Sequence, residues 1–500
     1  MQARRTPLFS VPVFLSKPKD KDMSEASLKE KTAKGLLWGG ISNGLQQLLN
    51  LVFGIFLARL LTPADYGMVG MLTIFSLIAS TLQDSGFTAA LTNKKDIKQE
   101  DYNAVFWFSI STGVVLYLLL FIAAPFIADF FNQPELSALA RYSFLGFVIS
   151  STGTAQNAYI FRNLMVRQKA QSVCLGLFIS GIVGITLAYN GYSYWGIATQ
   201  SLVYVSVVNG SYWIFSPWRP DFKINFKPLK GMISFSYKML ITNIFNHLNN
   251  NIFSVILGKF YNEKEVGFYN QANKWNYLSY SLVNGMISGV AQPVLAQVAN
   301  ERERQLRVFR KMIRFTAFVS FPAMFGLSLI APEFITIAIT DKWMNSAQIL
   351  QLLCIHGAFI PIITLYSNLI VSKGKSNIYM WNTITIGLIQ ILTLLALYPY
   401  GLRTMIVTYV ALNIAWLLVW HYFVWKEIRY SLFHLVKDMV PYVVIAAGVM
   451  VATYYLTLSI ENIYLLIISK IVVAALLYIA LMWLSGSKTF KESLNYLLHR

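Results

Sequence analysis

The chain alternates between long apolar runs and short polar breaks along most of its length. The run AVFWFSISTGVVLYLLLFIAAPFIADFF at 104–131 is one example. A transmembrane helix needs about 20 mainly apolar residues, so we predict fourteen spans and an all-α integral membrane protein. The expected spans are 34–60, 66–91, 104–131, 138–161, 171–190, 194–215, 231–258, 265–298, 311–331, 345–371, 376–398, 402–424, 439–458 and 462–484.

Composition and charge support a polytopic membrane protein. Hydrophobic residues make up 56% of the chain, charged residues 13%, and the mean hydropathy is +0.52. A net charge of +19 would suggest nucleic acid binding in a soluble protein, but here it reflects the excess of Lys and Arg in cytoplasmic loops. With the N-terminus inside, the loops expected outside hold few of the 41 Lys and Arg residues. These few are Arg59, Arg141, Lys259, Lys264, Lys342 and Arg403. We therefore predict that both termini are cytoplasmic and that nucleic acid is not a partner.

One short pattern occurs twice, 200 residues apart. FGIFLARLLTPADYG at 53–67 and FSVILGKFYNEKEVG at 253–267 match in their apolar, charged and glycine positions. Each segment is the outer end of one span, a turn and the start of the next span. A weaker echo is the Ala-Pro pair at 124–125 and at 331–332, where the third and ninth spans are expected to end. The pattern indicates two parallel-repeat six-helix halves around a central cavity, with two additional C-terminal helices.

This repeat sets the predicted organisation of the chain. The expected parts are a cytoplasmic N-terminal segment at 1–33, a half at 34–215, a cytoplasmic linker at 216–230, a half at 231–425, a linker at 426–438, two helices at 439–484 and a cytoplasmic tail at 485–500. MQARRTPLFSVPVFLSKPKDKD lacks a signal-peptide cleavage site and precedes a second methionine, Met23. We expect residues 1–22 to be disordered or to derive from an upstream start-site assignment.

Polar residues recur at helical spacing on spans next to the repeated turns. The stripes are Lys238, Thr242, Asn246 and Asn249 on the seventh span, Asn270, Lys274 and Tyr277 on the eighth, and Gln46 and Asn50 on the first. Amides in membranes also serve as contacts between helices, and this alternative remains open for each one. Together with two lysines, the stripes predict a hydrated substrate cavity between the halves, suited to an anionic substrate.

Other polar residues give weaker signals. Asp84, near the cytoplasmic end of the second span, is the candidate for ion coupling, and a buried structural carboxylate is the alternative. Lys470 stands alone on a peripheral span, so we expect snorkelling or a partner contact. Both cysteines, Cys174 and Cys354, lie in apolar runs, and no His/Cys cluster has metal-ligand spacing. We therefore predict neither a cofactor nor a metal.

Two segments carry a family resemblance. KEKTAKGLLWGGISNGLQQLLNLVFGIFLARLLTPADYGMVGM and DSGFTAALTNKKDI are similar to the start of bacterial polysaccharide-export flippases of the multidrug/oligosaccharidyl-lipid/polysaccharide superfamily. The resemblance is nearest to the Wzx-type exporters of colanic-acid and teichuronic-acid clusters, and it covers about residues 28–485. The positions that match the family pattern are Arg59, Asp65, Tyr66, Gly67, Asp84 and Gly86. The resemblance implies a structural role for them at the turn and in helix packing.

The resemblance also implies a function. Such proteins move undecaprenyl-pyrophosphate-linked oligosaccharides across the bacterial inner membrane, where a polymerase and glycosyltransferases of the same pathway are the expected partners. A cation-coupled multidrug exporter of the same superfamily is the nearer alternative, and it would favour intramembrane acids over lysines. A membrane glycosyltransferase or ligase would need a large outside loop with catalytic carboxylates, and the expected loops are short. We therefore predict a transporter that is not an enzyme.

Overall fold

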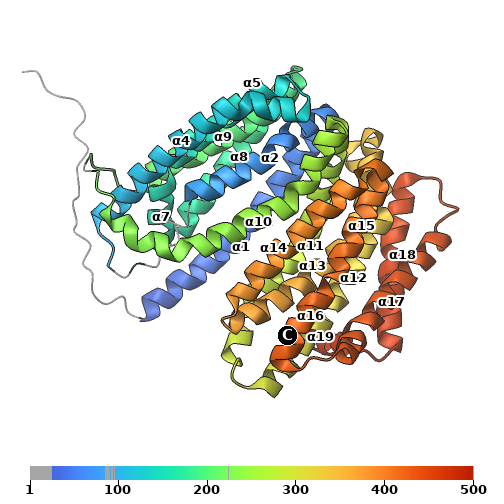
Figure 1. Cartoon of the computed structure of the whole chain (residues 1–500). Helices are drawn as coiled ribbons and strands as arrows, with labels where there is room; N and C mark the ends of the chain where they lie inside the picture. The colour runs from blue at the N-terminus through green and yellow to red at the C-terminus, as the bar shows by residue number, and fades with distance from the viewer. Residues whose placement is uncertain (1–24, 85–90, 92–93, 95, 223, 499–500) are drawn as a thin grey trace, which may run out of the picture.

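The computed structural model describes the backbone of residues 25–84, 91, 94, 96–222 and 224–498, and every regular element in this part is helical (Figure 1). Within these ranges, nine helices are long and apolar enough to cross a membrane. The prediction of an all-α, multi-pass membrane protein is confirmed. The count of fourteen spans and the division into two repeat halves stay predictions. Residues 1–22 lie outside the described ranges.

The first part of the chain forms eight described helices, up to residue 215. They are α1 (Glu25–Leu60), α2 (Pro63–Asp84), α4 (Gln99–Phe131), α5 (Glu135–Ser143), α6 (Leu145–Ser151), α7 (Thr154–Arg162), α8 (Val166–Tyr189) and α9 (Tyr194–Phe215). The span predicted at 138–161 is thus wrong as a single helix, because it is broken into α5, α6 and α7. One break falls at Gly153, where a Cβ would overlap the side chain of Asn209 on α9. The absence of a side chain at Gly153 allows α9 to pack closely against this segment.

The second part holds the remaining helices. They are η1 (Lys227–Leu229), α10 (Lys230–Phe260), α11 (Glu263–Gln297), α12 (Arg302–Ile339), η2 (Asp341–Trp343), α13 (Met344–Ser372), α14 (Ser376–Leu397), η3 (Tyr398–Tyr400), α15 (Leu402–Ala415), α16 (Leu417–Ile428), α17 (Leu432–Leu456), α18 (Ile463–Leu484) and α19 (Lys488–Leu498). α2 packs against α10 and α11, which joins the first part to the second. α13 packs against α11 and α12, and α17 and α18 cover α12 at the far side of the molecule (Figure 1).

Two prolines that were expected near helix ends lie inside helices instead. α4 continues six residues past Pro125 and ends at Phe131, the predicted end of the third span, whereas α12 continues from Pro332 to Ile339, beyond its predicted end at 331. A proline removes the N–H that would bond the carbonyl four residues earlier, and in a membrane that carbonyl needs another donor. Arg141 Nε donates to the Phe121 carbonyl (3.4 Å), and Gln351 Nε2 donates to the Ser328 carbonyl (3.2 Å). These side chains explain why the helices continue.

Pro322, inside α12, likewise leaves the carbonyl four residues earlier without its helical donor, and this leads to a stability prediction. The freed carbonyl of Phe318 accepts a hydrogen bond of 2.8 Å from the Tyr478 hydroxyl on α18. Tyr478→Phe should lower the free energy of unfolding by about 1–3 kcal/mol, because the partly buried carbonyl would lose its donor. Thermal unfolding in detergent would measure the loss. Tyr422→Phe, an exposed tyrosine on α16, is the matched control, and equal losses in the two variants would contradict the explanation.

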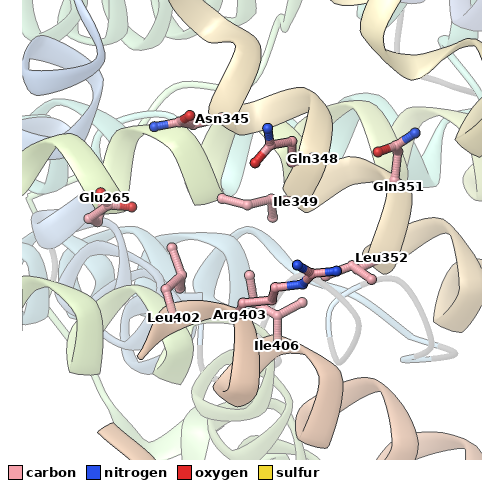
Figure 2. A pocket seen from close by; sticks show the side chains of 9 residues that line it. All are labelled: Glu265, Asn345, Gln348, Ile349, Gln351, Leu352, Leu402, Arg403 and Ile406. Carbon is pink, nitrogen blue, oxygen red and sulfur yellow. The ribbon is translucent and has the colours of Figure 1, made fainter. Parts of the chain in front are cut away.

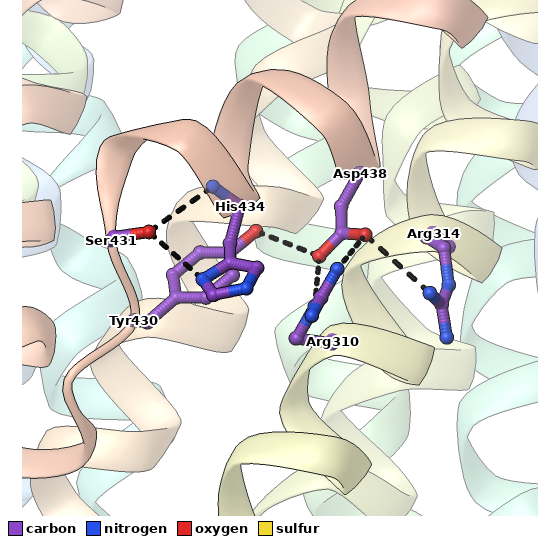
Figure 3. A network of polar contacts seen from close by, with 6 residues as sticks. All are labelled: Arg310, Arg314, Tyr430, Ser431, His434 and Asp438. Atoms are coloured by element: carbon purple, nitrogen blue, oxygen red, sulfur yellow. Dashed lines mark hydrogen bonds and ion pairs between the residues drawn. The ribbon is translucent and has the colours of Figure 1, made fainter.

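A buried carboxylate connects α17 to α12 (Figure 3). The side chain of Asp438 is 1% exposed, and Arg310 donates to both of its oxygens at 2.7 and 3.0 Å. Arg314 lies 3.5 Å from the same carboxylate, and the Tyr430 hydroxyl donates to it at 3.4 Å. A bidentate Arg–carboxylate contact fixes both distance and orientation. The two helices are therefore held in one register at this end.

A second ion pair connects α18 to α12. Lys470 Nζ lies 2.6 Å from Glu333 Oε1, with both side chains buried, and it also donates to the Leu329 carbonyl at 3.3 Å. The expectation that Lys470 snorkels or binds another protein is wrong, because its partner lies within the chain. The predicted end of the ninth span at 331 had placed Glu333 in an outside loop. Apolar helices gain little from leaving lipid for one another, so these two pairs are specific attachments for α17 and α18.

Candidate functional site

The two repeated turns meet at the start of α2 and α11. A Cβ on Gly67 would overlap the backbone carbonyl of Glu263, and a Cβ on Gly267 would overlap the backbone carbonyl of Pro63. The contact is reciprocal, since each glycine lies against the first residue of the opposite helix at the equivalent repeat position. Only residues without a side chain allow backbones to approach this closely. The geometry supports the predicted relation between the turns, and it brings α2 and α11 together at this end.

The other family-pattern residues also hold backbone in place. Thr62 and Asp65 form a reciprocal capping box, because the Asp65 carboxylate accepts from the Thr62 amide (2.8 Å) and the Thr62 hydroxyl accepts from the Asp65 amide (3.3 Å). Arg59 donates to the carbonyls of Ile337 and Ala338, at the end of α12. These contacts support the structural role that the resemblance implied. Gly86 lies outside the described residues, and so does the side chain of Asp84, the last residue of α2.

A cavity of about 650 Å³ lies between α2 and the helices α10, α11, α13 and α15; we call it the central cavity. Val69, Gly70 and Thr73 form its α2 wall, and the opposite wall carries Lys274 and several amides. Asn270 bridges the two sides, because its Oδ1 accepts from Ser254 at 2.7 Å while its Nδ2 lies against Gly70. The central cavity is therefore built by the packing of the first part against the second.

Lys274 supplies the formal charge of the central cavity. Its Nζ lies 2.6 Å from the position that a Cβ on Gly54 of α1 would take, so the glycine leaves room for the ammonium group. Among the described residues, Lys274 has no hydrogen-bond or ion-pair partner. No Asp or Glu is among the described residues that line this cavity. The cavity can therefore receive an anionic group without displacing an existing ion pair.

A second cavity of about 340 Å³ lies inside the second part, between α10, α11, α13, α14 and α15. We call it the amide chamber, defined by Asn249, Asn284, Asn382, Gln390, Asn413 and Trp416. It adjoins the central cavity, because some residues line both. The shared residues are Asn250, Tyr277, Tyr280, His356, Ile360 and Tyr409.

The predicted site residues divide between these cavities. Asn270 and Lys274 line the central cavity, and Tyr277 lines both. Asn246 and Asn249 line the amide chamber, because their helix face is turned toward α14, where Asn249 Nδ2 donates to the Thr383 carbonyl at 2.9 Å.

The other predicted residues are not part of either described lining. Gln46 donates to Ser42 on its own helix, and Asn50 is exposed. Lys238 belongs to α10, and its side chain lies outside the described part of the structure.

Sequence reasoning missed most of the amide chamber. Its α14 wall is Tyr379, Asn382, Thr383 and Gln390, and its α15–α16 wall is Tyr409, Asn413, Trp416 and Trp420. Both sets recur at helical spacing, so each marks one helix face. That spacing was the available signal for a polar helix face. It does not identify a cavity, because aromatic and amide residues are common on any packed helix face.

A third cavity, of about 550 Å³, lies near the starts of α11, α13 and α15 (Figure 2). Asn345, Gln348 and Gln351 form one wall, and Figure 2 shows Arg403 facing them from α15. Glu265 contributes a half-buried carboxylate at one end. This cavity was not predicted, because its residues lie in or near the expected outside loops.

Comparison with known proteins identifies the family. The model of the family described as "Polysaccharide biosynthesis protein" matches residues 56–348, which is more than half of the 500 residues. The chain belongs to this family. This confirms the recognition of a polysaccharide biosynthesis family.

Two relatives of this family member have polysaccharide-related names. "Teichuronic acid biosynthesis protein TuaB" of Bacillus subtilis is 24% identical over 87% of this chain and 91% of its own length. "Lipopolysaccharide biosynthesis protein WzxC" of Escherichia coli is 24% identical over 70% of this chain and 72% of its own. Both relatives are thus named as proteins of polysaccharide biosynthesis.

Solved transporters share the fold of this polysaccharide biosynthesis family member. "Lipid II flippase MurJ, inward closed conformation" has a TM-score of 0.69 at 16% identity and covers 93% of this chain and 100% of its own. An inward-facing multidrug resistance MATE transporter has a TM-score of 0.59 at 18% identity, over 77% of this chain and 94% of its own. The titles of these two solved structures describe a flippase and a transporter, and the similarity shows that this chain shares their fold.

Proposed function

We propose that the protein translocates polyprenyl-pyrophosphate-linked oligosaccharides across the bacterial inner membrane by alternating access of the central cavity. The glycan would serve the biosynthesis of a surface polysaccharide, and both termini would be cytoplasmic. A pyrophosphate and its sugars cannot enter hydrocarbon without losing their hydration. A polar cavity between two helical bodies replaces that hydration while the polyprenyl chain stays in lipid.

The observation that carries this proposal is the Lys274 ammonium, which has no partner among the described residues, in a cavity whose described lining holds no carboxylate. A pyrophosphate supplies the anion that this ammonium lacks, and the surrounding amides and tyrosines offer donors to phosphate oxygens and sugar hydroxyls. The fold shared with a lipid flippase supports the same function. A polymerase and glycosyltransferases are the partners expected to supply and consume the substrate.

The charge of the residues that line the central cavity favours this proposal over a multidrug exporter, the function of the MATE neighbours. A cationic drug would meet Lys274 without a compensating Asp or Glu among the residues lining the central cavity. The like charges would repel, and an anion is favoured instead.

The proposal predicts a transport defect when Lys274 loses its charge. Full-length protein in proteoliposomes should move a fluorescent polyprenyl-pyrophosphate oligosaccharide between leaflets, followed as protection from a membrane-impermeant quencher. Lys274→Met keeps the length of the side chain but removes the ammonium. We expect transport to slow by about tenfold or more, since charge-assisted contacts to an anion contribute about 1.5–3 kcal/mol.

Lys264→Met is the matched control, because Lys264 is exposed on the first turn of the same helix. Its transport rate should match that of the wild type. If the wild-type protein exports organic cations and moves no glycolipid, the drug-exporter function replaces the proposed one. If Lys274→Met transports at the wild-type rate, Lys274 is not on the transport path.

A further inference from the structure

We propose that the amide chamber binds the uncharged sugar units of the transported glycan and so determines substrate selectivity. The inference rests on the proposed function and adds a second binding site to it. The pyrophosphate would lie at Lys274 in the central cavity, and the adjoining sugars would enter the chamber through the lining that the two cavities share.

Unpaired polar atoms in the chamber wall indicate a ligand with hydroxyl groups. Asn382 and Gln390 are 5% and 3% exposed, and each donates its amide N–H within the protein, to the Ile378 carbonyl and to Asn413 Oδ1 respectively. Their carbonyl oxygens have no hydrogen-bond partner among the described residues. Buried polar atoms are normally paired. The wall thus offers two acceptors that sugar hydroxyls can satisfy.

A donor accompanies these acceptors. The indole N–H of Trp416 is buried and has no acceptor in the part of the chain that the structure describes. A hydroxyl group both donates and accepts, so one sugar ring can satisfy amide oxygens and an indole N–H together. Carboxylates and phosphates only accept, and they would meet unpaired amide oxygens here. The donor and acceptor set therefore favours a neutral sugar.

Charge and aromatic content agree with this assignment. Within the described part of the chain, the residues that line the chamber include no Asp, Glu, Lys or Arg. Tyr379 of the α14 wall and Trp420 of the α15–α16 wall lie with ring centroids 6.2 Å apart, and such faces suit the C–H surface of a sugar ring. The volume of about 340 Å³ is within the range of small-molecule sites, about 300–1,000 Å³.

The inference predicts that the chamber distinguishes lipids with and without sugar. The probes are undecaprenyl pyrophosphate and undecaprenyl-pyrophosphate N-acetylglucosamine, both tested in proteoliposomes with the full chain. In the variant Gln390→Leu, Trp416→Phe, the rate ratio of the sugar-bearing to the sugar-free lipid should fall about tenfold or more, because several hydrogen bonds to the sugar are lost. An unchanged ratio would overturn the inference.

A matched variant and a binding measurement complete the test. Trp381→Phe on α14 is the control, because Trp381 is 61% exposed and lies outside the chamber; its rate ratio should equal that of the wild type. Free N-acetylglucosamine should change the tryptophan fluorescence of the wild type more than that of Trp416→Phe. Glucuronate should change neither, and an equal response to both sugars would contradict selection of neutral units.

These measurements separate the two proposals. If neither lipid moves in the wild type while N-acetylglucosamine changes the Trp416 signal, the proposed function fails and the sugar site stands. If both lipids move and the double variant keeps the wild-type ratio, the proposed function stands and the sugar site fails.

Discussion

A chain that carries Gly67→Val and Gly267→Val is expected to lose closure of the end where α2 and α11 meet, and with it most transport. Each new side chain would overlap a backbone carbonyl of the opposite helix, Glu263 or Pro63. Backbone cannot yield as a flexible side chain can. Overpacking costs about 1–3 kcal/mol, which corresponds to about 5- to 150-fold in the equilibrium between closed and open states.

Labelling of a buried cysteine would measure this shift. Val266 is fully buried beside Gly70, so a Val266→Cys thiol in a chain lacking Cys174 and Cys354 reports on opening. A membrane-impermeant maleimide should label it faster in the double-valine chain. Gly289→Val on the same helix is the control, since a Cβ there meets nothing within 4 Å. Equal labelling rates would show that the glycine contact does not close this end.

Asp438→Ala should produce the largest loss of stability. The substitution leaves the guanidinium of Arg310, 22% exposed, without the carboxylate that now accepts two of its hydrogen bonds. Removal of one partner from a buried ion pair costs about 3–5 kcal/mol. The partial exposure of both arginines places the expected loss near the lower figure. Thermal unfolding in detergent would show it as a lowered midpoint.

Two further variants test the cause of that loss. Glu461→Ala, at an exposed acid between α17 and α18, should leave the unfolding midpoint close to that of the wild type. Asp438→Leu combined with Arg310→Met should recover much of the stability, because replacing both partners removes the unpaired charge. A double variant as unstable as Asp438→Ala would assign the loss to packing rather than to charge.

Much of the fold was readable because the membrane imposes simple requirements. Twenty-residue apolar runs have few alternatives to a helix, so the all-α, multi-pass class could be predicted. The orientation, inferred from the charge difference between loops, stays a prediction. The repeated turn was equally informative. Its two glycines are the residues that the structure brings against opposite backbones. The sequence match predicted equivalent positions in two repeats, and the contact between them was found only in the structure.

Helix ends at prolines were not readable, because they depend on tertiary contacts. Pro332 does not end α12, because Gln351 supplies the hydrogen-bond donor that the Ser328 carbonyl needs. The same error hid Glu333 in an expected loop and left Lys470 without an apparent partner. A single mistaken boundary thus changed the interpretation of two charged residues.

The sequence predicted that polar residues line a cavity, but not that they are distributed between two cavities. Lys274 and Asn270 line the central cavity, as the stripe on their helix suggested. Asn246 and Asn249 share a helix face that turns toward α14 instead. Helical spacing shows which residues share a face, whereas the neighbour of that face is decided by packing across the whole chain.

The Lys470–Glu333 pair has a consequence for biosynthesis. The two residues are 137 positions apart, and ribosomes add about 5–20 residues per second. Glu333 therefore emerges on the order of 10 s before its cation has been made. During that interval α12 must remain beside water or other polar groups rather than face lipid. α18 thus completes the insertion of α12, which is made long before it. A chain that stops before α18 would leave Glu333 of α12 without its ion-pair partner.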